Sequence, residues 1–458
     1  MAYTTVSRKL VRFRHIPAET RRRFMETMMV LIVSEMADSL CGLIDGMYVG
    51  KFLGNDAMAA HGVAAPVFTF LCIFSYLIAA AIQHACPVAI GENRPREANG
   101  YFNIALTAVL SLGAVLTVIG LAFPTWTATM LGSGSGPIRP LAADYLRGVA
   151  PGTIPLVLFL VLVPVLQIEG RWGLVHVGSA VMAVSDVALD YINIHFLNGG
   201  MFGMGLATSI SYTLGLGVFL LYFAKRKRIF SVDPGSMKGI RVPQFFSTGL
   251  PTGVRMTARM FSLVIINVLV VNMAGSTAMA AMAIQRNLST VVLSAVVGLS
   301  AAVLTLTSLS YGKQDTEGMG DAVRLGYRHS FGVVAIFATA LFFAAPLVTS
   351  LYLDRADAAF SLTVKAIRWL AASMPLTAWN WCFGSYLHGI GKIALSTRLF
   401  IYGELVTQCF TALVLGLVWG ADGIFASFAV SQAIILVTLV SYRPKIFLSL
   451  QDKGFSRE

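Results

Sequence analysis

The sequence predicts an all-α polytopic membrane protein with 12 transmembrane helices, arranged in two six-helix bundles related by a pseudo-twofold axis along the membrane normal. The first observation behind this prediction is composition. Of the 458 residues, 56% are apolar and only 12% are charged, and the mean hydropathy is +0.74. A water-soluble domain has about a quarter of its residues charged, so most of this surface must face lipid.

The second observation is a series of long apolar runs. A helix needs about 17 to 25 residues to cross a bilayer, and runs of this length and uniformity favour helices over the alternating strands of a barrel. The runs lie at 26–50, 60–89, 101–124, 142–168, 173–197, 203–224, 246–273, 278–311, 328–353, 361–388, 394–419 and 421–442.

The third observation is an internal repeat. "GNDAMAA" at 54–60 recurs as "GSTAMAA" at 275–281, and "GTIPL" at 152–156 resembles "ASMPL" at 372–376, with offsets of 221 and 220. A constant offset indicates two copies of a six-span unit. The predicted parts are a basic N-terminal segment (1–25), a first bundle (26–224), a basic linker (225–245), a second bundle (246–443) and a tail (444–458).

Positive charge indicates the topology. The net charge is +12, and Lys and Arg gather before the first run, in the linker ("KRKR" at 225–228) and at the C-terminus. Because positive loops stay cytoplasmic, we expect both termini to be cytoplasmic. This distribution predicts contact with the lipid bilayer and no nucleic-acid partner.

Carboxylates interrupt the apolar runs of the first half. Asp186 and Asp190 lie one helical turn apart in "SDVALDY", and Asp38 and Asp45 share one face of the first run. Charges inside a membrane are costly and by default mark function. Several carboxylates in a weakly solvated pocket cannot all stay ionised, because desolvation and mutual repulsion both favour the neutral form. Such a cluster takes up and releases protons as one coupled system.

Structural roles are the alternative for these charges. Glu35 lies near the end of the first run. A structural hydrogen bond to a neighbouring side chain accounts for it as well as a role in proton coupling does. In the second half, Arg255, Arg259 and Arg286 lie within runs that also hold Glu404. Arg–Glu pairing that holds this half together is favoured over ligand binding. Polar residues that either line a cavity or bridge helices are Asn267, Asn272 and Gln285.

Motifs of enzymatic chemistry are absent from the sequence. No G-x-x-x-x-G-K-[ST], C-x-x-C or H-E-x-x-H pattern occurs, so we expect no enzyme, no metal site and no organic cofactor. A membrane-embedded acyl or prenyl transferase would need a polar catalytic motif at the membrane surface, and the sequence shows none.

Three segments carry a family resemblance. "GLIDGMYVGKFLGNDAMAAHGVAAPVFTFL" at 42–71, "SDVALDYINIHFLNGGMFGMGLATSISY" at 185–212 and "STGLPTG" at 247–253 resemble the first-helix, fifth-to-sixth-helix and seventh-helix regions of the MATE (multidrug and toxic compound extrusion) transporters. The resemblance implies a monomeric exporter of organic cations and amphipathic drugs in the bacterial plasma (inner) membrane. Export would proceed by alternating access, driven by inward flow of H⁺ or Na⁺.

The resemblance also assigns residues. By position, Asp45 matches the first-helix acid and Asp190 the fifth-helix acid, the pair associated with cation coupling. Asp186 stands where the family usually has Asn, and Asp38 where relatives have an uncharged polar residue, so the coupling stoichiometry stays open. The predicted coupling residues are therefore Asp38, Asp45, Asp186 and Asp190. The predicted substrate cavity comprises Asp45, Asp190, Arg255, Arg259, Gln285 and Asn267.

The sequence leaves open the coupling ion and the class of substrate. The arginines of the seventh run, Arg255 and Arg259, argue against an acidic cation site in the second half, which favours H⁺ over Na⁺. They also leave open a second function, a flippase for a lipid-linked or other anionic amphipathic substrate, since arginine binds phosphate well.

Overall fold

A computed structural model describes residues 18–131, 138–224, 228–353, 355–356 and 358–451. The described elements of the first half are all helical. They are α2 (Ala18–Tyr48) with a π-helical turn (Val49–Leu53), α3 (Asn55–Gly91), α4 (Pro95–Ala122), α5 (Pro124–Met130), α6 (Ile138–Val149), α7 (Thr153–Ile168), α8 (Trp172–Ile192) with a π-helical turn (Asn193–Leu197), and α9 (Gly200–Leu220).

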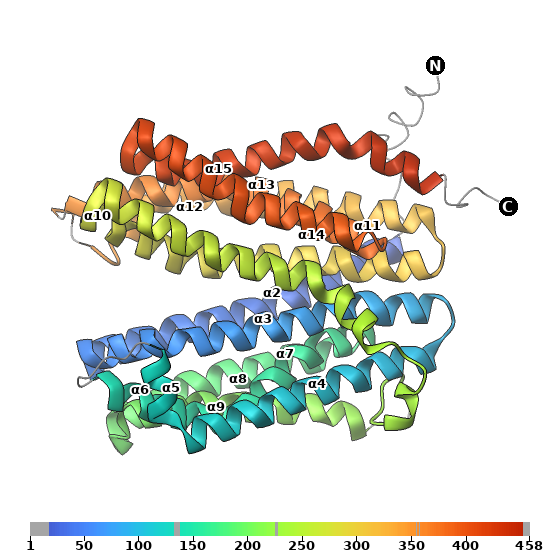
Figure 1. Ribbon diagram of the computed structural model, residues 1–458, viewed down its shortest axis with the longest axis horizontal. Helices are drawn as coiled ribbons and strands as arrows, with labels where there is room; N and C mark the ends of the chain where they lie inside the picture. Colours follow the sequence, from blue (N-terminus) through green and yellow to red (C-terminus); the bar gives the residue numbers. More distant parts are fainter. Residues whose placement is uncertain (1–17, 132–137, 225–227, 354, 357, 452–458) are drawn as a thin grey trace.

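The second half is helical as well. It comprises α10 (Val242–Gly312), α11 (Thr316–His329), α12 (Ala335–Thr349), α13 (Ala358–Gly389), α14 (Ile393–Ile401) with a π-helical turn (Tyr402–Thr407), and α15 (Gln408–Gln451). A straight helix of 71 residues would be about 107 Å long. In Figure 1, however, the green start and the yellow end of α10 lie at the same side of the molecule, so α10 folds back on itself.

The helices confirm the predicted fold class in its broad form. Within the described residues, nine helical segments are long and apolar enough to cross a membrane, from Ala60–Gly91 to Ile393–Leu439. The last of these contains Gly420, whose φ of 60° interrupts α15 at the predicted boundary between the runs 394–419 and 421–442. Glycine tolerates this left-handed conformation without steric cost.

Several boundaries differ from the sequence-based ones. α2 begins at Ala18, about two turns before the first apolar run. Ion pairs of Arg22 with Glu26 and of Arg23 with Glu19 support these turns at i,i+4 spacing. α15 continues beyond the last apolar run to Gln451. Residues 1–17, most of the "KRKR" motif (225–227) and residues 452–458 lie outside the described part of the chain.

The two halves of the sequence form two layers (Figure 1). Helices α2 to α9, coloured blue to green, lie below, and α11 to α15, coloured orange to red, lie above. α10 connects the layers, since it packs against α2 and α3 of the first half and against α13 of the second.

Among the described residues, the buried apolar side chains join the two layers at one end. We call this the α3–α4 end, because it holds the turns after Gly91 and Gly312. One cluster of buried side chains there includes residues of both halves, such as Ile82 and Val303. At the opposite end the core divides: one cluster around Ala57 and Tyr145 belongs to the first half, and another around Ile266 and Phe425 belongs to the second.

Glycines let the halves approach closely at the α3–α4 end. A Cβ atom on Gly312 would lie 2.2 Å from the carbonyl oxygen of Val88, and one on Gly249 would lie 2.0 Å from that of Leu77. Such distances are far below van der Waals contact, so any side chain at these positions would push the layers apart.

This close approach predicts that Gly312→Ala destabilises the protein, by about 1–3 kcal/mol as expected for overpacking. The matched control is Gly217→Ala in α9, where an added Cβ meets nothing within 4 Å and alanine favours the helix. Thermal unfolding of both purified variants in one detergent measures the difference. Equal melting temperatures of Gly312→Ala and wild type would contradict the close approach of Gly312 to Val88.

Candidate functional site

Three carboxylates from two helices meet inside the first half. Asp45 lies in α2 and is 8% exposed, while Asp186 and Asp190 lie in α8 and are 1% and 0% exposed. The carboxyl of Asp45 interacts directly with those of Asp186 and Asp190. Asp38 also lies in α2, but its side chain is outside the described part of the structure.

Polar neighbours from two further helices complete this cluster. The hydroxyl of Ser211 in α9 donates to Asp186 Oδ1 at 2.7 Å. Tyr145 in α6 is close enough to interact electrostatically with all three carboxylates, and its ring packs edge-on against His61 at 5.1 Å between centroids. We call Asp45, Asp186 and Asp190 the acidic cluster.

Glycine packing places Tyr145 beside the acidic cluster. A Cβ on Gly205 of α9 would lie 2.4 Å from the carbonyl oxygen of Tyr145, and one on Gly148 of α6 would lie 2.3 Å from that of Phe202. α6 and α9 therefore touch backbone to backbone. Sequence reasoning missed Tyr145 and Ser211, although the recurrence of Ser211 as Ser431 at the repeat offset of 220 was a usable signal.

The acidic cluster is short of positive charge. Among the described residues, Asp45 Oδ1, Asp186 Oδ2 and both Asp190 carboxyl oxygens receive no N–H or O–H donor, and no salt bridge to the cluster is found. Carboxyls in direct contact repel one another unless they share a proton or bind a cation. The arrangement therefore suits bound protons or a bound cation. Within the described residues, no group of His, Cys, Asp and Glu is placed to hold a metal ion.

Glu35 lies outside this cluster, in a pocket between the two halves. It accepts a hydrogen bond of 2.8 Å from the hydroxyl of Tyr76 in α3. The same pocket is lined by Gln83 from the first half and by Arg255 from α10. Arg255 and Glu35 interact electrostatically, so this pocket carries opposite charges from opposite halves.

Trp381 organises the charges of the second half. The Arg255 guanidinium, 5% exposed, lies 3.9 Å from the centroid of the Trp381 ring, a cation–π contact. The indole N–H of Trp381 donates to Glu404 Oε1 at 2.7 Å. The expected Arg–Glu pairing thus takes an indirect form: within the described residues no salt bridge joins Arg255 or Arg259 to Glu404, and Trp381 lies between them.

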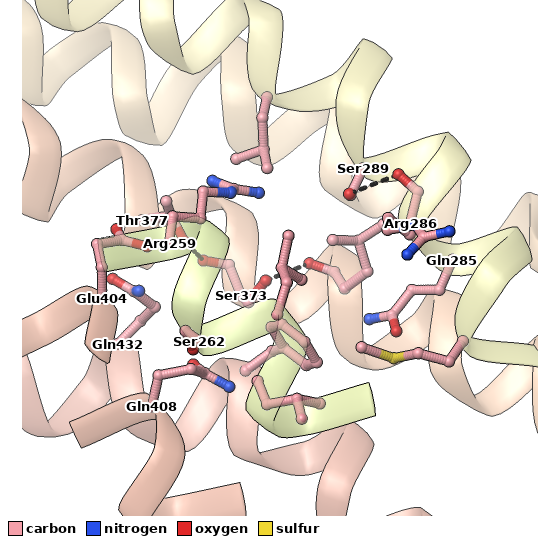
Figure 2. A pocket seen from close by; sticks show the side chains of 16 residues that line it. Arg259, Ser262, Gln285, Arg286, Ser289, Ser373, Thr377, Glu404, Gln408 and Gln432 are labelled. Atoms are coloured by element: carbon pink, nitrogen blue, oxygen red, sulfur yellow. Dashed lines mark hydrogen bonds between the residues drawn. The ribbon is translucent and has the colours of Figure 1, made fainter. Parts of the chain in front are cut away.

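A second pocket lies wholly within the second half (Figure 2). Arg259, Glu404, Gln408 and Gln432 gather at one side of it, and Gln285 and Arg286 at the other. We call it the second-half pocket. Its apolar lining consists of Leu263, Ile266, Met282, Leu293, Leu370 and Phe428.

The residues predicted to form one substrate cavity are distributed over several places. Asp45 and Asp190 are enclosed in the first half, Arg255 lines the pocket between the halves, and Arg259 and Gln285 line the second-half pocket. Asn267 lines neither of these two pockets, and its Oδ1 is buried without a hydrogen-bond partner.

The comparisons with known proteins agree with this fold. The family described as MatE matches residues 31–192 and 251–414. The chain therefore belongs to the MATE family of membrane transporters, as its resemblance predicts, and it is not an enzyme. The two matched segments begin 220 residues apart, the offset of the sequence repeat.

Individual relatives span most of the chain. A "Probable multidrug resistance protein NorM" of Pseudomonas syringae pv. tomato is 27% identical over 369 residues, which are 76% of each chain. A protein of the same name from Xanthomonas axonopodis pv. citri is 25% identical over 353 residues, or 75% of each chain.

Solved structures share the fold. One described as an outward-facing conformation of a multidrug resistance MATE family transporter has a TM-score of 0.86 at 20% identity, covering 94% of this chain and 97% of that one. A transporter from Pyrococcus furiosus, described by the reverse polarity of its binding pocket, has a TM-score of 0.85 at 20% identity over 96% and 97% of the two chains.

The role of Trp381 generates a prediction. Trp381→Phe keeps an aromatic ring but leaves the buried Glu404 without its donor, which we expect to cost about 1–3 kcal/mol of stability. Trp369→Phe, the same substitution at a side chain that is 37% exposed, should change stability little. Thermal unfolding in detergent compares the two, and equal melting temperatures would show that the indole N–H does not hold Glu404.

Proposed function

We propose that this protein exports cationic amphipathic compounds in exchange for protons. The observation that carries the proposal is the acidic cluster: three buried carboxylates in contact, with no basic partner among the described residues. Such a site is stable when it holds protons or a cation and unstable when it holds neither. Competition between the two ligands for one site is what an antiporter requires.

The names of relatives support the substrate class. A "Multidrug export protein MepA" of Staphylococcus aureus is 19% identical over 232 residues, half of each chain, and the NorM relatives are named for multidrug resistance. A negatively charged site inside an apolar protein suits drugs that combine a positive charge with apolar rings.

The proposed topology follows from charge and repeat. Twelve spans form the two bundles, 26–224 and 246–443, related by a pseudo-twofold axis, with both termini cytoplasmic and the chain in the bacterial plasma membrane. The family match to both halves at an offset of 220 supports the duplication. With this orientation the α3–α4 end is cytoplasmic.

With this orientation, we infer an outward-facing state, which the packing of the two ends supports. The joint apolar core and the glycine contacts close the cytoplasmic end, while the cores of the two halves are separate at the other end. Buried histidines belong to this closure: His84 of α3 lies 3.1 Å from the hydroxyl of Ser308, and its ring centroid is 5.3 Å from that of His388.

Alternating access links this closure to the acidic cluster. From the outside, protons neutralise the cluster and weaken its attraction for a bound cation, which leaves. On the cytoplasmic side, the protons dissociate and a new cation binds. A ligand shifts the equilibrium between the two states only by its difference in affinity for them, and charge attraction in a weakly screened site supplies several kcal/mol.

The first test removes charge from the cluster. In cells that express Asp45→Asn or Asp190→Asn, we expect efflux of a fluorescent cation to fall at least about tenfold, since one lost charge interaction of more than 1.4 kcal/mol suffices. Asp56→Asn, an exposed aspartate in the first turn of α3, is the matched control. If both cluster variants, expressed at the wild-type level, still show near-normal, proton-driven efflux, the proposal is contradicted.

The second test concerns orientation. We place a single cysteine at exposed Met130 or at exposed Arg96, in a background in which the five native cysteines are replaced. A membrane-impermeant maleimide should label Met130→Cys in intact cells and Arg96→Cys only after permeabilisation. The reverse pattern would show that the α3–α4 end faces outward.

A further inference from the structure

The second-half pocket lies in the second copy of the repeat and carries a different set of charged residues from those of the first copy. At the repeat offset of 220 to 221, Ser211 corresponds to Ser431 and Asp38 to Arg259. Ser211 donates to the carboxylate of Asp186, whereas Ser431 donates to the amide oxygen of Gln408 at 2.5 Å. The serine hydroxyl thus meets a carboxylate in the first half and a neutral amide in the second, and an arginine stands at the sequence position that corresponds to Asp38.

Three acceptor atoms of the pocket wall already accept hydrogen bonds from neighbouring side chains. Gln408 Oε1 accepts from Ser431, Gln432 Oε1 accepts from Asn380 at 2.9 Å, and Glu404 Oε1 accepts from Trp381. The Gln408 amide nitrogen donates one N–H to Ser427 Oγ at 3.1 Å and keeps the other, and the Gln432 amide also keeps N–H donors for a ligand. The wall therefore has N–H donors that a ligand can use.

Two side chains of the pocket have unused binding capacity. Arg259 forms no salt bridge within the described residues, and its nearest recorded contact is the Trp381 ring, 5.7 Å away. Gln285, only 2% exposed, lines the pocket with an Oε1 that has no partner, and its amide can turn to present either atom. A buried amide without a partner is costly unless a ligand supplies one.

We propose that the second-half pocket binds the carboxylate of an amphipathic organic acid or zwitterion, with Arg259 as its ion-pair partner. The planar guanidinium matches a carboxylate bidentately, and Gln432, at the same side of the pocket, donates to the same group. Gln285, at the other side, hydrogen-bonds a polar atom elsewhere on the ligand. The apolar body of the ligand packs on Leu263 and Ile266, and Arg286, exposed at the other side, attracts the anion.

Glu404 sets the strength of this site. Its carboxylate lies in the same wall and repels an anion, so the site holds a carboxylate only transiently, as transport requires. This proposal rests on the proposed transport function but concerns other residues than the acidic cluster does.

The test measures binding of dansylamino-undecanoate and of its neutral primary amide to the purified full chain in lipid nanodiscs. Wild type should bind the carboxylate more tightly than the amide. Arg259→Gln should weaken carboxylate binding about tenfold or more, which is about 1.4 kcal/mol, and leave amide binding unchanged. Arg259→Lys should keep part of the preference, and Glu404→Gln should strengthen carboxylate binding several-fold.

The same variants separate this inference from the proposed function. Asp190→Asn should lose export of a fluorescent cation while it still binds the carboxylate. Equal binding of carboxylate and amide to wild type, or an equal loss of both probes in Arg259→Gln, would overturn the anionic site. Neither result would affect the proposal for the acidic cluster, which depends on cation export.

Discussion

Burial of three carboxylates in contact is the constraint on which the rest of this molecule depends. Asp45, Asp186 and Asp190 are enclosed by α2, α6, α8 and α9, and Ser211 satisfies only one of their oxygens. A site of this kind cannot be left empty and fully ionised, because the desolvation and repulsion of several charges cost more than the fold can supply. Its occupancy by protons or by a cation is therefore tied to the conformation of the helices around it.

Close helix packing connects the acidic cluster to the rest of the molecule. Backbone contacts at Gly148 and Gly205 fix α6 against α9 beside the cluster, and contacts at Gly249 and Gly312 fix the two halves together at one end. The cores at the other end are independent. Two rigid units that touch at one end are suited to rocking about a shared interface. In the same repeat, Arg259 stands at the sequence position that corresponds to Asp38, which gives the second unit a different charge.

Much of this could be predicted from the sequence. The low charge content, the apolar runs and the repeat at offset 220 predicted a helical membrane fold, and "SDVALDY" predicted an acidic face on α8. The contacts of Trp381 with Arg255 and Glu404 could not be predicted, because they join α10, α13 and the turn before α15, which are far apart in sequence. The contact of Tyr145 with the acidic cluster could not be predicted either, because Tyr145 is far in sequence from Asp45 and Asp190. The boundary predicted between the runs 246–273 and 278–311 lies within α10, which folds back on itself (Figure 1).

The proposed export depends on which ions the acidic cluster exchanges for its cargo. The most direct measurement reconstitutes the purified protein in liposomes and imposes a pH gradient and a sodium gradient separately, while the movement of a fluorescent cation is followed. We expect the pH gradient alone to drive transport, and Asp186→Asn to change the number of protons moved per cation. Transport driven by sodium without a pH gradient, and unchanged by Asp186→Asn, would contradict proton exchange at this cluster.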